Sequence, residues 1–282
     1  MISARDMLRW LIASLCILAG VCPASSSFAS DPPTATQNAS AAPEDALPDA
    51  PEPHLSVTER GLPLAILKDQ IPIWTSPVRV RTRDLIWLLP LGAVTGVTLA
   101  TDTNVMRYVS RDRTFNKDNV NASNALLGSE IAVSVGLYSV GVFKRDSHAR
   151  ETGILSGEAL ADSEVVVEVS KIIFRRERPL DNNAAGDFFA PNIGANGSFP
   201  SSHSMLAWTL AGVVADEYPS KWVKVGAYSI ASSVSLTRVL GQEHFPSDVL
   251  VGAAAGWLIG HYIVEKHQVH HKAHALRAEV ER

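Results

Sequence analysis

Cysteine is nearly absent from this 282-residue chain, and the two that occur, Cys16 and Cys22, both lie close to the N-terminus. The rest of the chain therefore contains neither a disulfide framework nor a zinc site built on cysteine. The chain also lacks an excess of basic residues. It contains 25 Lys and Arg and 29 Asp and Glu, which gives a formal net charge of −4. This mildly acidic balance argues against a nucleic-acid-binding protein, which usually shows a basic excess.

Long uninterrupted hydrophobic runs are lacking as well. Hydrophobic residues make up 46% of the chain, an ordinary fraction for a globular protein. The apolar stretches are near or below the length of about 20 residues that a helix needs to cross a bilayer. Several of them contain Glu or Asp or many Ser, Thr and Gly. Two interpretations stay open, the buried helices of a soluble bundle and a membrane protein with short spanning helices, and the sequence leans towards a soluble or peripherally attached domain.

Residues 1–29 are typical of an export signal. Arg5 and Arg9 give a basic start, residues 11–21 are apolar, and Ser27-Phe28-Ala29 places small residues where a signal peptidase reads. Cleavage after Ala29 would remove both cysteines and leave a thiol-free chain suited to an oxidising compartment. We therefore predict an exported protein, located in the periplasm or on the outer face of the cytoplasmic membrane. An uncleaved anchor is the alternative.

Four further segments follow the predicted signal. Residues 30–55 form a Pro- and Ala-rich acidic linker with six prolines, five acidic residues and neither Lys nor Arg, so we expect it to be disordered. Residues 56–82 form a lead-in segment with a short amphipathic piece. Residues 83–266 carry the main domain. Residues 267–282 form a polar tail with several histidines, which we expect to be solvated rather than to bind a metal.

The main domain is predicted to be all-α. Six helical stretches are expected, at residues 85–100, 125–143, 153–174, 204–217, 221–240 and 248–265. Pro179 and Pro219 follow two of these stretches and Gly241 follows a third, which are typical positions for residues that end a helix. Because helix follows helix without alternating strands, the sequence predicts a bundle of six helices.

Two clusters of polar residues lie at predicted helix ends. Lys171 is near the end of one helix and Arg178-Pro179 just beyond it, so a movable ammonium and a planar guanidinium can converge on one anion. Pro200-Ser201-Ser202-His203 opens the next helix, where unpaired backbone N–H groups and the helix dipole favour an anion. Taken alone, the first cluster would be a solvated basic helix end and the second an ordinary serine cap.

A third cluster contains Arg238, His244 and Asp248. A carboxylate four residues after an imidazole can accept from one ring nitrogen, which fixes the tautomer and frees the other nitrogen. Taken alone, this pair would be a surface histidine beside an aspartate that caps a helix. The three clusters together are much more specific than any one of them.

The set of clusters resembles the type 2 phosphatidic acid phosphatase (PAP2) superfamily, which also includes bacterial class A acid phosphatases and vanadium haloperoxidases. The pattern of that superfamily is Lys-x6-Arg-Pro, then Pro-Ser-Gly-His, then Ser-Arg-x5-His-x3-Asp, and the resemblance covers about residues 84–265. Two departures occur, since Ser202 replaces the glycine of the second motif and Thr237 the serine of the third. Ser202 still has a backbone N–H to donate, and Thr237 keeps a hydroxyl.

The resemblance implies a phosphatase that forms a phosphohistidine. His244 would attack the phosphorus, Asp248 would orient His244, and His203 would protonate the leaving group and then activate water. The phosphate-binding residues would be Lys171, Arg178, Ser201, Ser202 and Arg238. We expect neither a metal nor another cofactor, and we expect vanadate to inhibit. The substrate would be a phosphorylated lipid, such as phosphatidate or a prenyl diphosphate, or a small soluble phosphomonoester.

Two other functions stay open. In a vanadate-dependent haloperoxidase the same cations would hold vanadate as a prosthetic group, with His244 as its axial ligand. In a non-catalytic membrane protein they would bind phosphate or a lipid head group without turnover. Of the remaining residues near the motifs, Arg175, Arg176 and Glu177 are expected to be solvated, while Phe188 and Phe189 could either contact a lipid chain or pack within their loop.

Overall fold

The computed structural model describes residues 59–280, with side chains described as far as residue 268. Over this range the chain forms seven α-helices and five short 3-10 helices and contains no strand, so the predicted all-α fold class is confirmed. The predicted export signal, the acidic linker and the first residues of the lead-in segment lie outside the described residues.

The helices follow one another along the chain with short connections, apart from one long loop between α5 and α6. Their bounds are η1 (Glu59–Gly61), α2 (Leu62–Thr75), η2 (Ser76–Arg79), η3 (Thr82–Asp84), α3 (Leu85–Tyr108), α4 (Arg113–Lys144), α5 (Ser147–Phe174), η4 (Asn182–Ala184), η5 (Gly194–Asn196), α6 (Ser202–Glu217), α7 (Lys221–Leu240) and α8 (Pro246–Val280). The six predicted stretches correspond to α3–α8, and α2 is the amphipathic piece of the lead-in segment.

Helix α4 begins well before its predicted start at residue 125. The carboxylate of Asp112 caps this helix by accepting a hydrogen bond of 2.8 Å from the backbone N–H of Phe115. The first three turns are polar and therefore give no hydrophobic periodicity from which to predict them. Helix α8 also exceeds its predicted end, because its backbone stays helical to Val280, through most of the predicted tail.

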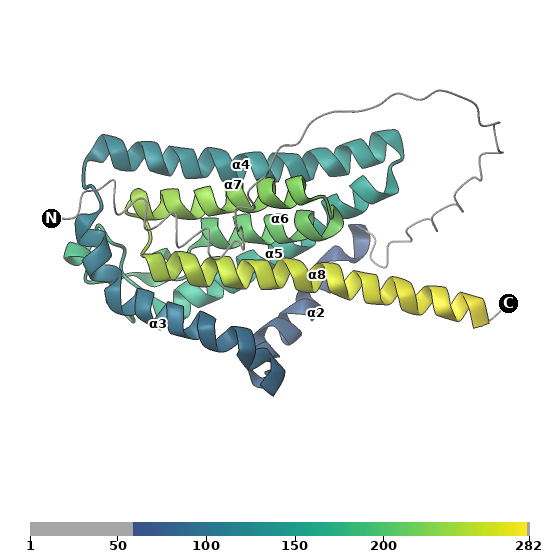
Figure 1. The fold of residues 1–282 in the computed structure, drawn as a ribbon, viewed down its shortest axis with the longest axis horizontal. Coiled ribbons are helices and arrows are strands. Elements are labelled where there is room, and N and C mark those ends of the chain that lie inside the picture. Colours follow the sequence, from purple (N-terminus) through teal and green to yellow (C-terminus); the bar gives the residue numbers. More distant parts are fainter. Residues whose placement is uncertain (1–58, 281–282) are drawn as a thin grey trace, which may run out of the picture. The chain divides into compact units, whose positions relative to one another are not determined.

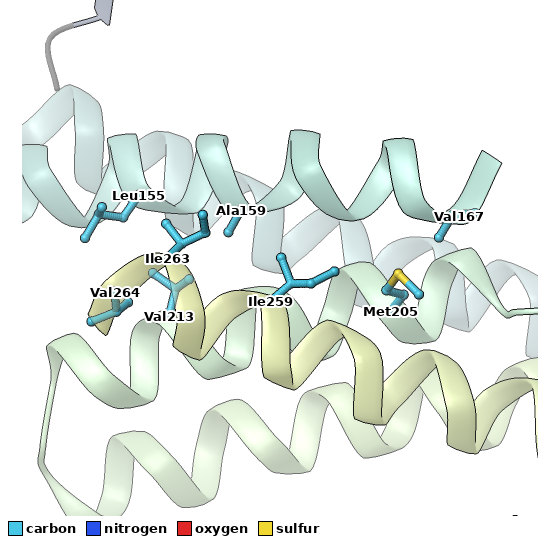
Figure 2. Packing of buried hydrophobic residues seen from close by; sticks show 8 residues of the cluster. All are labelled: Leu155, Ala159, Val167, Met205, Val213, Ile259, Ile263 and Val264. Atoms are coloured by element: carbon cyan, nitrogen blue, oxygen red, sulfur yellow. The ribbon is translucent and has the colours of Figure 1, made fainter. Parts of the chain in front are cut away.

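Helix α6 is central to the bundle, since it contacts α4, α5, α7 and α8 (Figure 1). A cluster of buried apolar side chains lies where α5, α6 and α8 meet. Figure 2 shows these side chains, which are Leu155, Ala159, Val167, Met205, Val213, Ile259, Ile263 and Val264. This core holds together the three helices that carry Lys171, His203 and Asp248.

Glycines spaced four residues apart let α8 approach the backbone of α6 closely. A Cβ on Gly252 would lie 2.7 Å from the carbonyl oxygen of Ser201, and one on Gly256 would lie 2.1 Å from that of Met205. Because a carbonyl oxygen cannot tolerate such contacts, only glycine fits at these positions. The close approach fixes the start of α6 against the first turns of α8.

Three helical segments are long and apolar enough to cross a membrane, namely Thr82–Tyr108, Arg113–Lys144 and Pro246–Gln268. Large hydrophobic side chains on α3 and α4 are exposed, among them Ile86 at 80% and Phe143 at 86%. Water-soluble proteins rarely expose apolar surface on this scale. The structure therefore favours association with a membrane over the soluble domain towards which the sequence leaned.

Candidate active site

Three connections bring helix ends together at one end of the bundle (Figure 1). They join α3 to α4, α5 to α6 and α7 to α8. Hydrogen bonds of side chains link these helix ends and connections to one another. The amide of Gln242 donates to the carbonyl of Val109 at 3.0 Å, and the ammonium of Lys171 donates to the hydroxyl of Ser202 at 3.4 Å. The predicted catalytic and phosphate-binding residues all lie at this end.

His203 lies in the first turn of α6 and is half-buried. Its Nε2 is 2.8 Å from Oδ1 of Asn124, a residue in the polar first part of α4. The pKa of His203 is lowered to about 4, mainly by burial and also by four neighbouring groups, namely Arg238, His244, Lys171 and Arg178. The two imidazoles and the three predicted cations are thus close enough to act on one another, and His203 is neutral in the unliganded protein.

His244 lies in the connection between α7 and α8 and is only 1% exposed. Its Nδ1 is 2.7 Å from the carbonyl oxygen of Ser198. Since a carbonyl oxygen can only accept, Nδ1 carries the proton and Nε2 keeps its lone pair. Burial, reinforced by the charges of Arg238 and Arg178, holds the pKa of His244 well below its usual range. His244 is therefore a neutral imidazole whose Nε2 keeps its lone pair.

Asp248 was expected to orient His244 directly, but its Oδ2 lies 3.8 Å from Nδ1 of His244, farther than the carbonyl of Ser198. The carboxylate is held by two other groups. Its Oδ1 is 2.5 Å from Nη1 of Arg176, and its Oδ2 accepts from the backbone N–H of Phe245 at 2.8 Å. Asp248 is thus held close to the imidazole without bonding to it directly, while Ser198 makes the orienting hydrogen bond.

The expectation that Arg176 is a solvated charge was wrong, because only 2% of Arg176 is exposed. Its guanidinium donates to Oδ2 of Asp102 at 2.8 Å and to the hydroxyl of Ser247 at 2.8 Å, in addition to Asp248. It also lies over the ring of Phe245, 4.1 Å from its centroid. Arg176 therefore ties α3 to the start of α8. The sequence did contain a signal for this contact. Asp102 is a single carboxylate near the end of the apolar helix α3, where a charged side chain usually has a buried partner.

The two serines of the second motif have different surroundings. Ser201 is fully buried, its hydroxyl caps α6 by accepting from the backbone N–H of Ser204 at 3.4 Å, and its own N–H donates to the carbonyl of Asp248 at 3.1 Å. Ser202 is half-buried and is the first residue of α6, so its backbone N–H has no acceptor within the helix. Of the two, Ser202 is the better placed to donate to an anion.

Arg238 is 5% exposed and only partly hydrogen-bonded. Its Nη1 donates to the hydroxyl of Ser123 at 3.3 Å, whereas its buried Nε has no partner among the described residues. A buried guanidinium N–H without an acceptor is a donor that an anionic ligand can use. The motif residue Thr237, by contrast, donates its hydroxyl to the carbonyl of Ser233 at 2.8 Å, within its own helix.

Sequence reasoning did not single out Glu243, which stands directly before His244. Its Oε2 forms ion pairs with Nη1 of Arg178 and, at 3.3 Å, with Nη2 of Arg238. One carboxylate therefore bridges two of the three predicted phosphate-binding cations.

The remaining predictions concern the loop phenylalanines and the histidine tail. Phe188 packs against Phe174 and Phe199, with ring centroids 6.4 and 5.6 Å apart, whereas Phe189 is 58% exposed. His267 is not solvated as expected of the tail, because it is 2% exposed and its Nε2 lies 3.0 Å from Oε2 of Glu158. In the part of the chain whose side chains are described, no group of three or more metal-ligating side chains is arranged to hold a metal ion.

Comparisons with known proteins agree with the motifs. Residues 153–272 match the family model described as the PAP2 superfamily. The chain is also 36% identical over 97 residues to the lipid A 1-phosphatase of Porphyromonas gingivalis. That match covers 34% of this chain and 19% of the length of its relative, so the two proteins correspond over one segment only.

Two solved structures are similar to this chain at low identity. LpxE of Aquifex aeolicus is 21% identical, with a TM-score of 0.45, over 58% of this chain and 94% of the other. The transmembrane PAP2-type phosphatidylglycerolphosphate phosphatase of Bacillus subtilis is 20% identical, with a TM-score of 0.41, over 73% of this chain and 95% of the other.

Proposed function

Since residues 153–272 match the family model of the PAP2 superfamily, we propose that this protein is a phosphatase that removes phosphate from a phosphorylated membrane lipid. One observation supports this most strongly. A neutral His244 with a free Nε2 lies within the electrostatic reach of Arg178, Arg238 and a second imidazole, His203. Phosphoryl transfer requires charge neutralisation and positioning of this kind.

In the first step, the lone pair of Nε2 of His244 forms a bond to phosphorus while the P–O bond of the ester breaks. The electrons of that bond go to the leaving oxygen, which takes a proton from His203. In the free protein the pKa of His203 is about 4, so the general acid must gain its proton when the anionic substrate arrives. A bound phosphate dianion favours that protonation, because an opposite charge stabilises the imidazolium.

In the second step, His203 takes a proton from water as the water oxygen bonds to phosphorus. The P–N bond then breaks, and its electrons return to Nε2 of His244. Lys171, Arg178 and Arg238 offset the charge on the phosphoryl oxygens throughout, together with the backbone N–H of Ser202. With three permanent cations in these positions, we propose that the reaction needs no metal ion. General acid–base catalysis of this kind typically contributes about 10²–10⁴-fold.

The position of the site supports a lipid as the substrate. All three segments able to span a membrane have an end at the level of the site, where α3 ends and α4 and α8 begin. A phosphorylated head group lies at that depth, at the interface between water and hydrocarbon. The exposed Phe189 lies on the loop beside the site and can contact an acyl chain. The similarity to a lipid A 1-phosphatase supports the same substrate class. Because the sequence predicts an export signal, we propose that the site lies on the outer face of the cytoplasmic membrane.

A substrate panel on the detergent-purified chain tests this function. We expect hydrolysis of phosphatidate or undecaprenyl diphosphate in mixed micelles to exceed that of para-nitrophenyl phosphate, and we expect vanadate to inhibit. The His203→Ala variant should bind phosphate but not turn over, and His244→Ala should form no acid-labile phosphoenzyme. Release of phosphate by His244→Ala at the normal rate would contradict the role of the nucleophile.

Two controls address the alternatives. Activity that is lost in EDTA and restored by zinc or magnesium would contradict the metal-free reaction. Oxidation of halide by the vanadate-loaded protein, without hydrolysis of any ester, would instead indicate a haloperoxidase. Binding of labelled phosphate without either activity would indicate a non-catalytic protein.

A further inference from the structure

Glu243 occupies a position that an anionic substrate needs. Its carboxylate oxygen Oε2 pairs with the guanidinium groups of both Arg178 and Arg238. A phosphate bound by the same two arginines would place one of its oxygens in the same region, because carboxylate and phosphate oxygens use the same guanidinium N–H groups. Both anions cannot occupy that region together, since two negative oxygens in van der Waals contact repel each other strongly.

The burial of His244 indicates that the unliganded site is closed. With 1% of its side chain exposed, Nε2 of His244 cannot be reached by a phosphorus atom that carries three further oxygens. The three members of the ion-pair bridge, Arg238, Arg178 and Glu243, all act electrostatically on this imidazole, in addition to Asp248 on its Nδ1 side. Glu243 is also the residue next to His244 in the chain, and its side chain is 25% exposed, so it is free to turn towards water.

The geometry points to Glu243 as an internal substitute for the substrate phosphate, a carboxylate that holds Arg178 and Arg238 together until the phosphate displaces it. This inference rests on the proposed function. In the resting state Glu243 neutralises two buried or half-buried cations that would otherwise lack an anion. When the substrate binds, the carboxylate withdraws, and the two arginines and Nε2 of His244 become accessible together.

Competition from Glu243 has a direct consequence for specificity. Inorganic phosphate must displace the carboxylate using its own charge alone, so it binds weakly and leaves readily after hydrolysis. A phosphorylated lipid gains additional binding free energy from its apolar part, which offsets the cost of displacing Glu243. The carboxylate therefore favours anchored phosphate esters over free phosphate and over small soluble esters.

The first test compares phosphate binding by the wild-type protein and the Glu243→Gln variant, measured calorimetrically and as inhibition of hydrolysis. Glutamine keeps the size of the side chain and removes its charge, so we expect inorganic phosphate to bind at least tenfold more tightly. If Glu243 instead positions the arginines for the substrate, phosphate will bind more weakly in the variant. Weaker or unchanged binding would overturn the inference.

The matched control is Glu177→Gln. Glu177 lies beside Arg178 in the chain, but its carboxylate accepts from the side chain of Asn182 at 3.2 Å and pairs with neither arginine of the bridge. The substitution removes the same charge from the same end of the bundle. It therefore shows whether phosphate binds more tightly because the carboxylate of Glu243 no longer competes for the arginines, or because the electrostatic potential of the site has become more positive. We expect phosphate affinity to change less than twofold, and an equal tightening in both variants would argue against a specific role of Glu243.

A second measurement follows the closure of the site without any turnover. Diethyl pyrocarbonate modifies accessible neutral imidazoles, and mass spectrometry locates the modified histidine. We expect His244 to react slowly in the wild-type protein and at least tenfold faster in Glu243→Ala, with inorganic phosphate restoring protection. Equal rates in both proteins would contradict the closed bridge. Because this readout and phosphate binding need no hydrolysis, they can succeed even if no ester proves to be a substrate, and that outcome would count against the proposed function alone.

Discussion

The carbonyl oxygen of Ser198 lies 2.7 Å from Nδ1 of His244 and decides which of its ring nitrogens carries the proton. Ser198 is held in turn by the segment that follows α5, because its backbone N–H donates to the carbonyl of Arg176 at 2.8 Å and its hydroxyl to the carbonyl of Glu177 at 2.9 Å. The first motif therefore does more than supply cations. Its backbone orients the imidazole of the third motif.

Ser202→Pro tests whether the backbone N–H at the start of α6 binds the phosphate. Proline is tolerated at the first position of a helix, and Ser201, with ψ of 114°, already has the extended conformation that must precede it. The substitution therefore removes one donor without disturbing the helix. We expect kcat to fall by about 10²–10³-fold, as on loss of an oxyanion donor, with an unchanged melting temperature.

Ser202→Ala serves as the control for that variant, since it removes the hydroxyl bonded to Lys171 and keeps the N–H. We expect Ser202→Ala to retain most of its activity. Equal activity of the proline and alanine variants would show that this N–H does not contribute.

Arg176→Gln tests the buried link between α3 and α8. The substitution leaves the carboxylates of Asp102 and Asp248 buried without their shared cation. Breaking a buried ion pair in this way costs about 3–5 kcal/mol, so we expect a large fall in the melting temperature. Arg176→Lys should recover only part of the loss, because one ammonium cannot match the planar fork that reaches both carboxylates. Thermal unfolding followed by circular dichroism would measure both, and full recovery by lysine would argue against the fork geometry.

Gly256→Ala tests the close packing of α6 and α8. The added methyl group would lie 2.1 Å from the carbonyl oxygen of Met205, so the two helices must separate. We expect a loss of about 1–3 kcal/mol in the free energy of unfolding, typical of an overpacked interface, together with reduced activity. Gly226→Ala is the matched control, because a Cβ at that position has no heavy atom within 4 Å.

The binding of a sulfate dianion tests the coupling between His203 and the bound anion. Sulfate keeps its charge between pH 5 and 8, so any titration belongs to the protein. In the unliganded protein the pKa of His203 is lowered to about 4, and a bound dianion raises it, so binding takes up a proton in the window above pH 4. We therefore expect sulfate to bind more tightly as the pH falls from 8 to 5. Calorimetry should show that the sulfate affinity of His203→Gln does not depend on pH in this range. If the affinity of this variant still rises as the pH falls, another group takes up the proton.

The sequence predicted the six helices of the bundle from their apolar stretches, and it predicted the residues that meet at one end of the bundle from short motifs at helix boundaries. It did not predict the residues that hold those motifs in place. Asn124 and Ser123 lie in polar turns of α4, where no apolar periodicity marks a helix. Arg176 lies among three other charged residues in the sequence. Its ion pair with Asp102, which is far away in the chain, is visible only in the structure.

The separation of Asp248 from the ring of His244 could not be predicted from spacing either. When an imidazole and a carboxylate are four residues apart at the start of a helix, they can either form a direct hydrogen bond or lie near each other without one. The structure has the second arrangement because the carboxylate is already engaged by Arg176 and by the N–H of Phe245.

Arg176 and His203 share one property, in that each has a hydrogen-bond partner outside residues 153–272. Arg176 bonds to Asp102 of α3, and His203 bonds to Asn124 of α4. The segment that matches the family model thus carries the residues that we propose to react, whereas the two earlier helices α3 and α4 carry side chains that bond to Arg176 and His203. A fragment or chimera cut at the boundaries of that segment would keep every motif intact and still be catalytically inert.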